Sequence, residues 1–271
     1  MEYRQNEIVY RGIVRLGQGL IALLRARVNY DGLQNLPPDT PAGEKRRWFR
    51  KATPGTSAVI AISHTSLLDF VFAQWTIYRA QGTHVRYMIA LKWANNEFMR
   101  AINGWCGHIP VNRAAGAAAY QDAKAKLERG EWVGIFPEGS RNRAIRPHRL
   151  RTGAVRLAQE TGSPVVPVAV FGGQRILGGG ARFKLRNLWR APVSVVIGVP
   201  LYVGPDEDVQ EANARLQQAL SDTVDRAIDL FPAEIPPGAA WMPADRGGSA
   251  PTVAEAEAAW EARRAEREKL G

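Results

Sequence analysis

Cysteine is almost absent from this chain, since Cys106 is the single one among 271 residues. One cysteine excludes an internal disulfide framework and a metal site built from several cysteines, and it fits a reducing compartment. The four histidines are scattered and show no metal-ligand spacing. We therefore predict no bound metal and no cofactor.

Long apolar runs are also missing. No apolar stretch approaches twenty residues, so we predict no transmembrane helix. The N-terminus lacks the continuous apolar stretch and small-residue cleavage site of a signal peptide. The sequence also has no Gly-x-Ser-x-Gly elbow, no P-loop, and no Gly-x-Gly-x-x-Gly after a strand, which argues against the chemistries these motifs serve.

The charge is strongly basic and unevenly spread. The net charge is +10 and the isoelectric point is about 10.1. Residues 206–271 hold 14 acids and only seven Lys or Arg, so residues 1–205 carry a net +17. Such a field attracts nucleic acid, an anionic membrane surface or a phosphorylated substrate.

Apolar strand patterns alternate with helical ones along most of the chain. The predicted strands are 58–62, 85–90, 108–111, 132–136, 165–170 and 193–199. The predicted helices that follow them are 66–80, 93–103, 115–129, 151–161 and 206–230. This alternation predicts an α/β fold with a mostly parallel central sheet flanked by helices.

Two terminal segments flank that α/β domain, which we place at residues 51–232. Residues 1–50 contain a predicted helix over 5–27 and a loop rich in Pro, Gly and charge. Residues 233–271 form a linker and a charged helix that opens with a capping-box pattern at Thr252.

The helix over 5–27 allows two interpretations. An apolar stripe recurs at helical spacing, and it consists of Val9, Ile13, Leu16, Leu20 and Leu24. Such a stripe packs on a core, or it lies in a membrane interface when arginines surround it, as they do here. The second interpretation predicts a peripheral protein on the cytoplasmic face of the cell membrane.

His64 and Asp69 stand five positions apart, directly after the apolar run 58–62. Catalytic groups are often carried by loops at strand ends. Ser66 and Asp69 have capping-box spacing, which would make Ser66 the N-cap of a helix with Asp69 in its first turn. His64 would then fold back toward Asp69 and act as a general base that the carboxylate orients. Alternatively, Asp69 merely caps a helix and His64 is an ordinary loop residue.

Two later strand ends carry candidate anion-binding residues. Arg113 follows the strand 108–111, which contains Pro110. The strand 132–136 is followed by Pro137-Glu138-Gly139-Ser140-Arg141 and then by a basic run that includes Arg151. Pro137 ends the strand, Gly139 permits an unusual backbone angle, and arginine offers a planar fork for phosphate. Glu138 would hold such an arginine or bind a substrate hydroxyl.

Two further segments are apolar or mixed. The strand 165–170 contains Pro167, which predicts an edge strand or a bulge. The segment 182–190 interleaves basic with apolar and aromatic residues, a pattern that suits a membrane interface or nucleic acid.

Taken in order, four motifs resemble the glycerolipid acyltransferases typified by 1-acylglycerol-3-phosphate (lysophosphatidate) acyltransferases. They are His64-Thr-Ser-Leu-Leu-Asp69, Gly107-His-Ile-Pro-Val-Asn-Arg113, Phe136-Pro-Glu-Gly-Ser-Arg141 and Val166-Pro-Val with its following glycines. Ser63 stands where the family usually has Asn, Ser140 where it has Thr, and Arg151 where many members have Lys.

The resemblance implies acyl transfer from acyl-CoA or acyl carrier protein to a glycerol hydroxyl, with N-terminal helices that dock on the membrane. His64 and Asp69 would be the general base pair. Arg113, Arg141 and Arg151, with Glu138, Gly139 and Ser140, would bind the phosphate of lysophosphatidate. Glycerol 3-phosphate, another lysophospholipid or a glycolipid remains an alternative acceptor. A basic membrane- or nucleic-acid-binding module is the non-enzymatic alternative, although no nucleic acid partner is expected.

Overall fold

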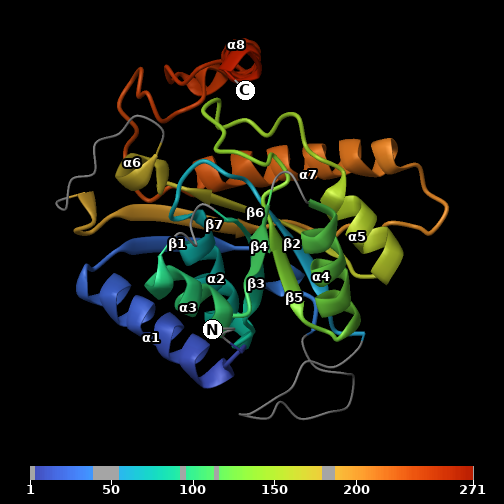
Figure 1. The fold of residues 1–271 in the computed structure, drawn as a ribbon. Helices are drawn as coiled ribbons and strands as arrows, with labels where there is room; N and C mark the ends of the chain where they lie inside the picture. The colour runs from blue at the N-terminus through green and yellow to red at the C-terminus, as the bar shows by residue number, and fades with distance from the viewer. Residues whose placement is uncertain (1–3, 39–54, 92–95, 113–115, 179–186, 271) are drawn as a thin grey trace.

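The structure is a computed structural model that describes residues 4–38, 55–91, 96–112, 116–178 and 187–270. Within these residues the strands form one sheet in the order β1-β7-β6-β2-β5-β3-β4 (Figure 1). All neighbouring strands are parallel except β6 and β7, so the prediction of a mostly parallel sheet is confirmed. The strands are β1 Arg27–Asp31, β2 Ala58–Ile62, β3 Val85–Ala90, β4 Ile109–Val111, β5 Trp132–Ile135, β6 Val165–Phe171 and β7 Pro192–Ile197.

Helices cover both faces of the sheet (Figure 1). Apolar residues of α2 pack on one face, where α1 and α3 lie beside α2, and apolar residues of α4, α5 and α7 pack on the other. The helices are α1 Glu7–Leu23, α2 Asp69–Gln81, α3 Glu97–Trp105, α4 Gly116–Glu128, α5 Gly153–Thr161, α6 Gln174–Leu177, α7 Val209–Asp229 and α8 Val253–Leu270, with 3-10 turns at Leu33–Asn35 and Ala244–Arg246.

The centre of the sheet brings two chemistry-bearing loops to one edge. Every residue of β2 is fully buried, as expected for a strand covered on both faces. β2 runs parallel to β5, with Ile60 opposite Gly134 and Ala61 opposite Ile135. The loops that follow these strands therefore leave the sheet side by side.

The prediction that Pro167 marks an edge strand is wrong, whereas the alternative prediction, a bulge, agrees with the pairing around it. β6 lies inside the sheet, between β7 and β2, and Pro167 is paired with Ala61. The Pro167 carbonyl accepts a hydrogen bond from Gly198 N at 2.8 Å, so its nitrogen also faces the β7 side. The β6–β7 ladder begins only at Val168, opposite Ile197. Pairing resumes at Val165, opposite Leu201, one residue out of that register, so the missing N–H falls in the irregular stretch between the two.

The predicted boundaries of the N-terminal segment also need correction. The helix ends at Leu23 rather than at residue 27, and residues 27–31 form β1, which pairs with β7 at the sheet edge. Arg25 has a positive φ of 52°, which breaks the helix before the strand begins. Residues 39–54 of the predicted loop lie outside the described residues.

The apolar stripe proposed for α1 is split between two faces. The buried face of the helix carries Tyr10 and Val14, with Ile21 packed against the core. Leu16 and Leu20, which the stripe included, point outward instead, at 77% and 54% exposure. No helix among the described residues is long and apolar enough to cross a bilayer.

The residues that follow α7 are packed rather than extended. The sequence predicts a linker over 231–250, but four apolar residues of this segment are buried against α7 and the ends of β6 and β7. They are Phe231, Ala239, Met242 and Ala250. Contacts distant in sequence hold this segment, which has no periodic pattern of its own.

A buried ionic cluster fastens α1 to the sheet. Arg86 on β3 is 4% exposed and pairs with Glu131 at 2.7 Å and with Glu7 of α1. Glu7 also bonds His84 at 2.7 Å. Burial alone would raise the pKa of Glu7, but His84 and Arg86 together lower it to about 2. The first residue of α1 is thus held as an anion.

Replacing Arg86 tests this attachment. Arg86→Met removes the buried cation that bonds Glu131 and leaves this buried carboxylate only the more distant, exposed Arg129 at 3.4 Å, which should lower the free energy of unfolding by about 3–5 kcal/mol. Adding Glu131→Gln should recover part of that loss because the poorly paired charge is removed. Urea unfolding measures both effects.

Arg100→Met is the matched control, because the Arg100–Glu97 pair is more than half exposed on both sides. Exposed pairs of this kind contribute less than about 1 kcal/mol. Equal losses from Arg86→Met and Arg100→Met would contradict the proposed anchoring.

Candidate active site

Asp69 is a fully buried carboxylate that organises the loop after β2. Its Oδ2 accepts hydrogen bonds from Thr65 N at 2.8 Å and from Ser66 N at 2.7 Å. The same oxygen lies 3.3 Å from Nδ1 of His64, whose side chain is 17% exposed. Placing the Nδ1 proton toward the carboxylate leaves Nε2 of His64 as a proton acceptor. The prediction from the sequence that His64 folds back toward Asp69 is therefore confirmed.

The predicted capping box has a different geometry. Helix α2 begins at Asp69 with Leu68 as its N-cap, two residues later than a Ser66 cap would require. The Asp69 carboxylate does accept the Ser66 N–H, as a capping box demands. The Ser66 hydroxyl, however, accepts from Leu68 N at 3.0 Å and donates to the Leu177 carbonyl at 3.2 Å. Ser66 thus links the loop to α6.

The glycines after β6 make room for this loop. A Cβ added at Gly173 would lie 3.3 Å from the Ser66 hydroxyl oxygen and 3.6 Å from Asp69 Oδ1. Gly172 has a φ of 106°, and a Cβ there would come within 2.4 Å of the Pro192 carbonyl. The backbone after β6 therefore lies against the His64–Asp69 loop at Gly173, while Gly172 lies against the start of β7.

Burial also changes the pKa of the Asp69 carboxyl. Burial raises its pKa above 3.8, while the bonds from His64 and from the two backbone amides oppose that rise. Oδ1 has no hydrogen-bond partner among the described residues. All the stabilisation of the carboxylate is thus concentrated on the oxygen that faces His64.

The loop after β5 lies on the other side of His64. Gly139 has a φ of 67°, the backbone angle for which a glycine was predicted. Its N–H donates to the Phe136 carbonyl at 3.0 Å and is therefore committed to the turn. Arg151 N donates a hydrogen bond to the carbonyl oxygen of the buried Pro137 at 2.8 Å. A Cβ added on Gly139 would lie 2.8 Å from Arg151 Nε. Arg151 therefore covers the turn.

Glu138 faces inward and bonds an amide rather than an arginine. Its Oε1 accepts from Asn142 Nδ2 at 3.4 Å, and Asn142 N in turn donates to the His64 carbonyl at 2.6 Å. Its Oε2 is buried with no partner among the described residues. Burial, reinforced by the nearby Asp69, raises the pKa of Glu138 well above its ordinary 4.5. Glu138 therefore keeps its proton to higher pH than an exposed glutamate.

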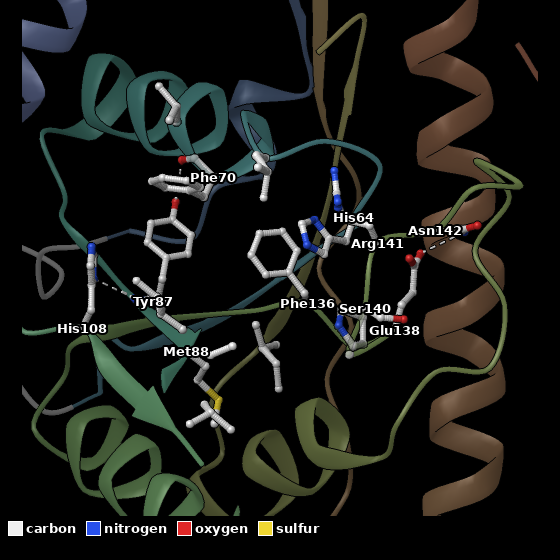
Figure 2. A pocket seen from close by; sticks show the side chains of 18 of the residues that line it. His64, Phe70, Tyr87, Met88, His108, Phe136, Glu138, Ser140, Arg141 and Asn142 are labelled. Atoms are coloured by element: carbon white, nitrogen blue, oxygen red, sulfur yellow. Dashed lines mark hydrogen bonds between the residues drawn. The ribbon is translucent and has the colours of Figure 1, made fainter. Parts of the chain in front are cut away.

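A cleft of about 2000 Å³ runs past His64 and has two unlike ends. Figure 2 shows the His64 imidazole beside the Phe136 ring, with centroids 4.2 Å apart. On one side the cleft is apolar, and its lining includes Phe70, Trp75, Tyr87, Met88 and Ile102. On the other side it is polar, and its lining includes Glu138, Ser140, Arg141, Arg149 and Arg151.

The remaining predicted residues are placed as follows. Ser140, Arg141 and Arg151 are exposed on the polar lining of the cleft. Pro110 pairs with Ile89 in the ladder between β3 and β4 and supports the sheet. Arg113 lies outside the described residues.

His108 lines the cleft but is unsuited to act as a base. Its Nδ1 accepts a hydrogen bond from Tyr87 N at 3.2 Å. Burial, with the nearby Arg86 and Lys126, lowers the pKa of His108 to about 3. These surroundings fit a structural role for His108.

Comparison with known proteins gives this arrangement a family. A family model described as Acyltransferase matches residues 27–171, which is more than half of the chain. The chain belongs to the acyltransferase family. The match includes β1 and both loops that form the site.

Curated proteins similar to this chain include two 1-acyl-sn-glycerol-3-phosphate acyltransferases. The chloroplastic 1-acyl-sn-glycerol-3-phosphate acyltransferase LPAT1 of Arabidopsis thaliana is 28% identical over 72% of this chain and 49% of its own length. The 1-acyl-sn-glycerol-3-phosphate acyltransferase of Bacillus subtilis is 28% identical over 68% of this chain and 78% of its own length. The chain thus spans about half the length of the plant relative and most of the bacterial one.

A solved structure shares the fold. It is the crystal structure of the 1-acyl-sn-glycerophosphate acyltransferase PlsC of Thermotoga maritima, with a TM-score of 0.60 and 18% identity. The match covers 79% of this chain and 78% of the other. It supports the acyltransferase fold described above.

The cleft also contains residues that no sequence motif marks. Arg149 was counted only within a basic run, and Trp260 and Arg263 of α8 were assigned to a terminal helix. All three line the polar end. No sequence pattern joins them, because α8 is more than 100 residues away from the loop after β5.

The raised pKa of Glu138 predicts that the stability of the folded protein depends on pH. A carboxyl whose folded pKa exceeds its unfolded value stabilises the fold below the unfolded value, and that contribution is lost as the pH rises. Glu138→Gln should therefore gain stability relative to the wild type as the pH increases from 4.5. Thermal unfolding in a series of buffers measures this difference.

Glu160→Gln serves as the matched control. The pKa of Glu160 is lowered by its hydrogen bonds to Lys124 and Tyr120. Its substitution should therefore lose stability relative to the wild type as the pH rises toward 4.5, and this difference should stay constant at higher pH. A Glu138→Gln difference that is flat with pH, or that has the sign of the control, would refute the raised pKa.

Proposed function

We propose that this protein transfers a fatty acyl chain from a thioester, acyl-CoA or acyl carrier protein, to the free hydroxyl of 1-acylglycerol 3-phosphate, making phosphatidic acid. One observation carries the proposal: the His64–Asp69 pair lies between the apolar and the arginine-bearing ends of one cleft. A lysophosphatidate has the same division, with an acyl chain at one end and a phosphate at the other.

The proposed step uses His64 as a general base. Its Nε2 takes the proton of the acceptor hydroxyl as the oxygen attacks the thioester carbonyl. A carbon–oxygen bond forms, the carbon–sulfur bond breaks, and the proton passes from His64 to the departing thiolate. Asp69 fixes the imidazole orientation and stabilises the imidazolium. General-base help of this kind typically contributes about 10²–10⁴-fold.

The arginines supply the anion site in this proposal. Arg141 and Arg151 line the polar end, and Arg113 follows β4, whose carboxyl end lies at the same edge of the sheet. Arginine forks match phosphate oxygens in pairs. The raised pKa of Glu138 favours a protonated carboxyl, which can donate a hydrogen bond to the acceptor. Ser140 lies beside them on the exposed turn and adds a hydroxyl.

The acceptor could differ while the chemistry stays the same. Glycerol 3-phosphate, another lysophospholipid or a glycolipid would use the same hydroxyl attack. The arginine-lined end favours an acceptor that bears phosphate over a neutral glycolipid. Assays with each acceptor and one acyl-CoA would rank them.

We also propose that α1 rests on an anionic membrane, on its cytoplasmic face. Its outward side carries exposed apolar residues, namely Ile8, Leu16, Leu20 and Leu23. Phe98 of the neighbouring α3 is 70% exposed as well. Arg4, Arg15 and Arg25 are exposed on or near the same helix. An apolar face with arginines around it is suited to an anionic lipid interface.

Substitution of the pair tests the proposed chemistry. His64→Ala removes the base and should lower kcat by about 10²–10⁴-fold. Asp69→Asn keeps the size but loses the charge that orients His64, and it should cost at least about 10²-fold. Release of free thiol in the presence of lysophosphatidate measures both rates.

Circular dichroism establishes that each variant is folded. Ser140→Ala is a useful neighbour for comparison, because its exposed hydroxyl has no part in the proton transfer and should leave kcat within about tenfold. Wild-type turnover by a folded His64→Ala or Asp69→Asn protein would overturn the assignment.

Substitution on α1 tests the membrane contact. The triple variant Leu16→Gln, Leu20→Gln, Leu23→Gln removes apolar area that inserts into lipid and should weaken binding to vesicles containing phosphatidylglycerol by at least about tenfold. Co-sedimentation with these vesicles measures the change.

Val199 and Tyr202 provide the control, since they are 72% and 68% exposed but lie outside α1. The double variant Val199→Gln, Tyr202→Gln should bind as the wild type does. Unchanged binding by the α1 variant, or an equal loss in the control, would disprove the docking role.

A further inference from the structure

The C-terminal segment, residues 231–270, lies beyond the part of the chain that the family model matches. It is nevertheless built into the molecule. Trp241 lies under the Arg175 guanidinium, 4.7 Å from its ring centroid, and its carbonyl accepts from Gln174 Nε2 at 3.2 Å. Met242 is buried in the apolar cluster beneath α7. These contacts fix the part of the segment that precedes α8.

Arg146 joins this segment to the loop after β5. Its guanidinium pairs with Asp245 of the C-terminal segment at 2.6 Å and with Asp225 of α7 at 2.8 Å. Figure 1 shows α8 above the loop between β5 and α5. The loop that carries the arginines of the cleft is therefore fixed from outside by the C-terminal segment.

One face of α8 forms a wall of the active-site cleft. Glu255, Ala256, Ala259, Trp260 and Arg263 all line it, together with His64 and Arg141. Their spacing of three and four residues puts them on a single side of the helix. The polar end of the cleft is thus closed on one side by residues from the far end of the chain.

Trp260 holds Arg149 in place. The Arg149 guanidinium lies over the Trp260 ring, 4.0 Å from the centroid, and Nη1 is 3.7 Å from Glu261. Arg149 has a φ of 53°, a backbone conformation that is costly for any residue but glycine, so surrounding contacts must maintain it. Stacking occupies the face of a guanidinium, while its N–H donors lie in the plane.

We propose that α8 is part of the acceptor-binding site and selects a phosphomonoester. Trp260 positions Arg149, and Arg263 faces the same end of the cleft, so both cations meet the phosphate of the acceptor. A phosphomonoester carries a charge near −2 at neutral pH and presents three oxygens. A phosphate that bears an esterified headgroup has less negative charge. Its headgroup would also have to fit beside the face of α8 that lines the cleft. This inference rests on the proposed function and names the acceptor class.

Steady-state kinetics with the full-length protein test the proposal. The acceptors are lysophosphatidate and lysophosphatidylcholine, with one acyl-CoA as donor. Arg149→Gln should raise the KM for lysophosphatidate by about 10–100-fold, the range for a hydrogen bond to a charged group. Trp260→Leu keeps apolar volume but removes the ring face, and it should raise the same KM by about 2–30-fold. In both variants kcat and the KM for acyl-CoA should stay within about twofold.

Arg215→Gln is the matched control, because Arg215 pairs with Glu207 at 2.6 Å and does not line the cleft. Its KM values should equal those of the wild type. An unchanged KM for lysophosphatidate in folded Trp260→Leu and Arg149→Gln would overturn the inference. A fall in kcat with no change in KM would overturn it too, since that pattern belongs to the chemistry.

The wild type separates this inference from the proposed function. A wild-type protein that makes no phosphatidate from lysophosphatidate refutes the proposed function, and the inference with it. An active wild type whose preference for lysophosphatidate over lysophosphatidylcholine survives Trp260→Leu and Arg149→Gln unchanged refutes the inference alone.

Discussion

The buried carboxylate of Asp69 is the interaction on which the site depends. One of its oxygens accepts two backbone N–H groups of the preceding loop and faces Nδ1 of His64. A buried carboxylate is costly unless such donors satisfy it. The same bonds that keep Asp69 inside the protein also fix the path of the loop and hence the place of the imidazole. Oδ2 of Asp69 therefore both fixes the loop and orients the His64 imidazole.

The surroundings of this pair are arranged by the sheet. Parallel β2 and β5 deliver their following loops to one edge, and Gly173 after β6 lets a third backbone segment approach the first loop. The His64 ring lies on Phe136, and the Asn142 amide bonds the His64 carbonyl. The apolar end of the cleft comes from α1, α2, α3 and β3, and the polar end from the loop after β5 and from α8.

Much of the fold and of the candidate site could be predicted from the sequence, because the patterns that indicate them lie within short segments. The buried runs of β2, β5 and β6 are continuous and apolar, and His64, Asp69 and Gly139 have spacings whose geometry follows from short-range rules. β1 was missed because Arg27-Val28-Asn29-Tyr30-Asp31 is an edge strand with a polar side. The edge position predicted from Pro167 was wrong because one strand's sequence does not show to which neighbouring strand each N–H points. The contact between Arg149 and Trp260 joins segments far apart in the chain, so no local pattern could reveal it.

The tautomer of His64 tests the central claim most directly. The chain has only four histidines, so nitrogen-15 spectra of histidine-labelled protein can be assigned by comparison with a His64→Gln variant. If Asp69 orients His64 as described, neutral His64 carries its proton on Nδ1, and Asp69→Asn shifts the ring toward the other tautomer. A proton on Nε2 in the wild type would contradict the account, because the nitrogen assigned to accept the hydroxyl proton would already be occupied.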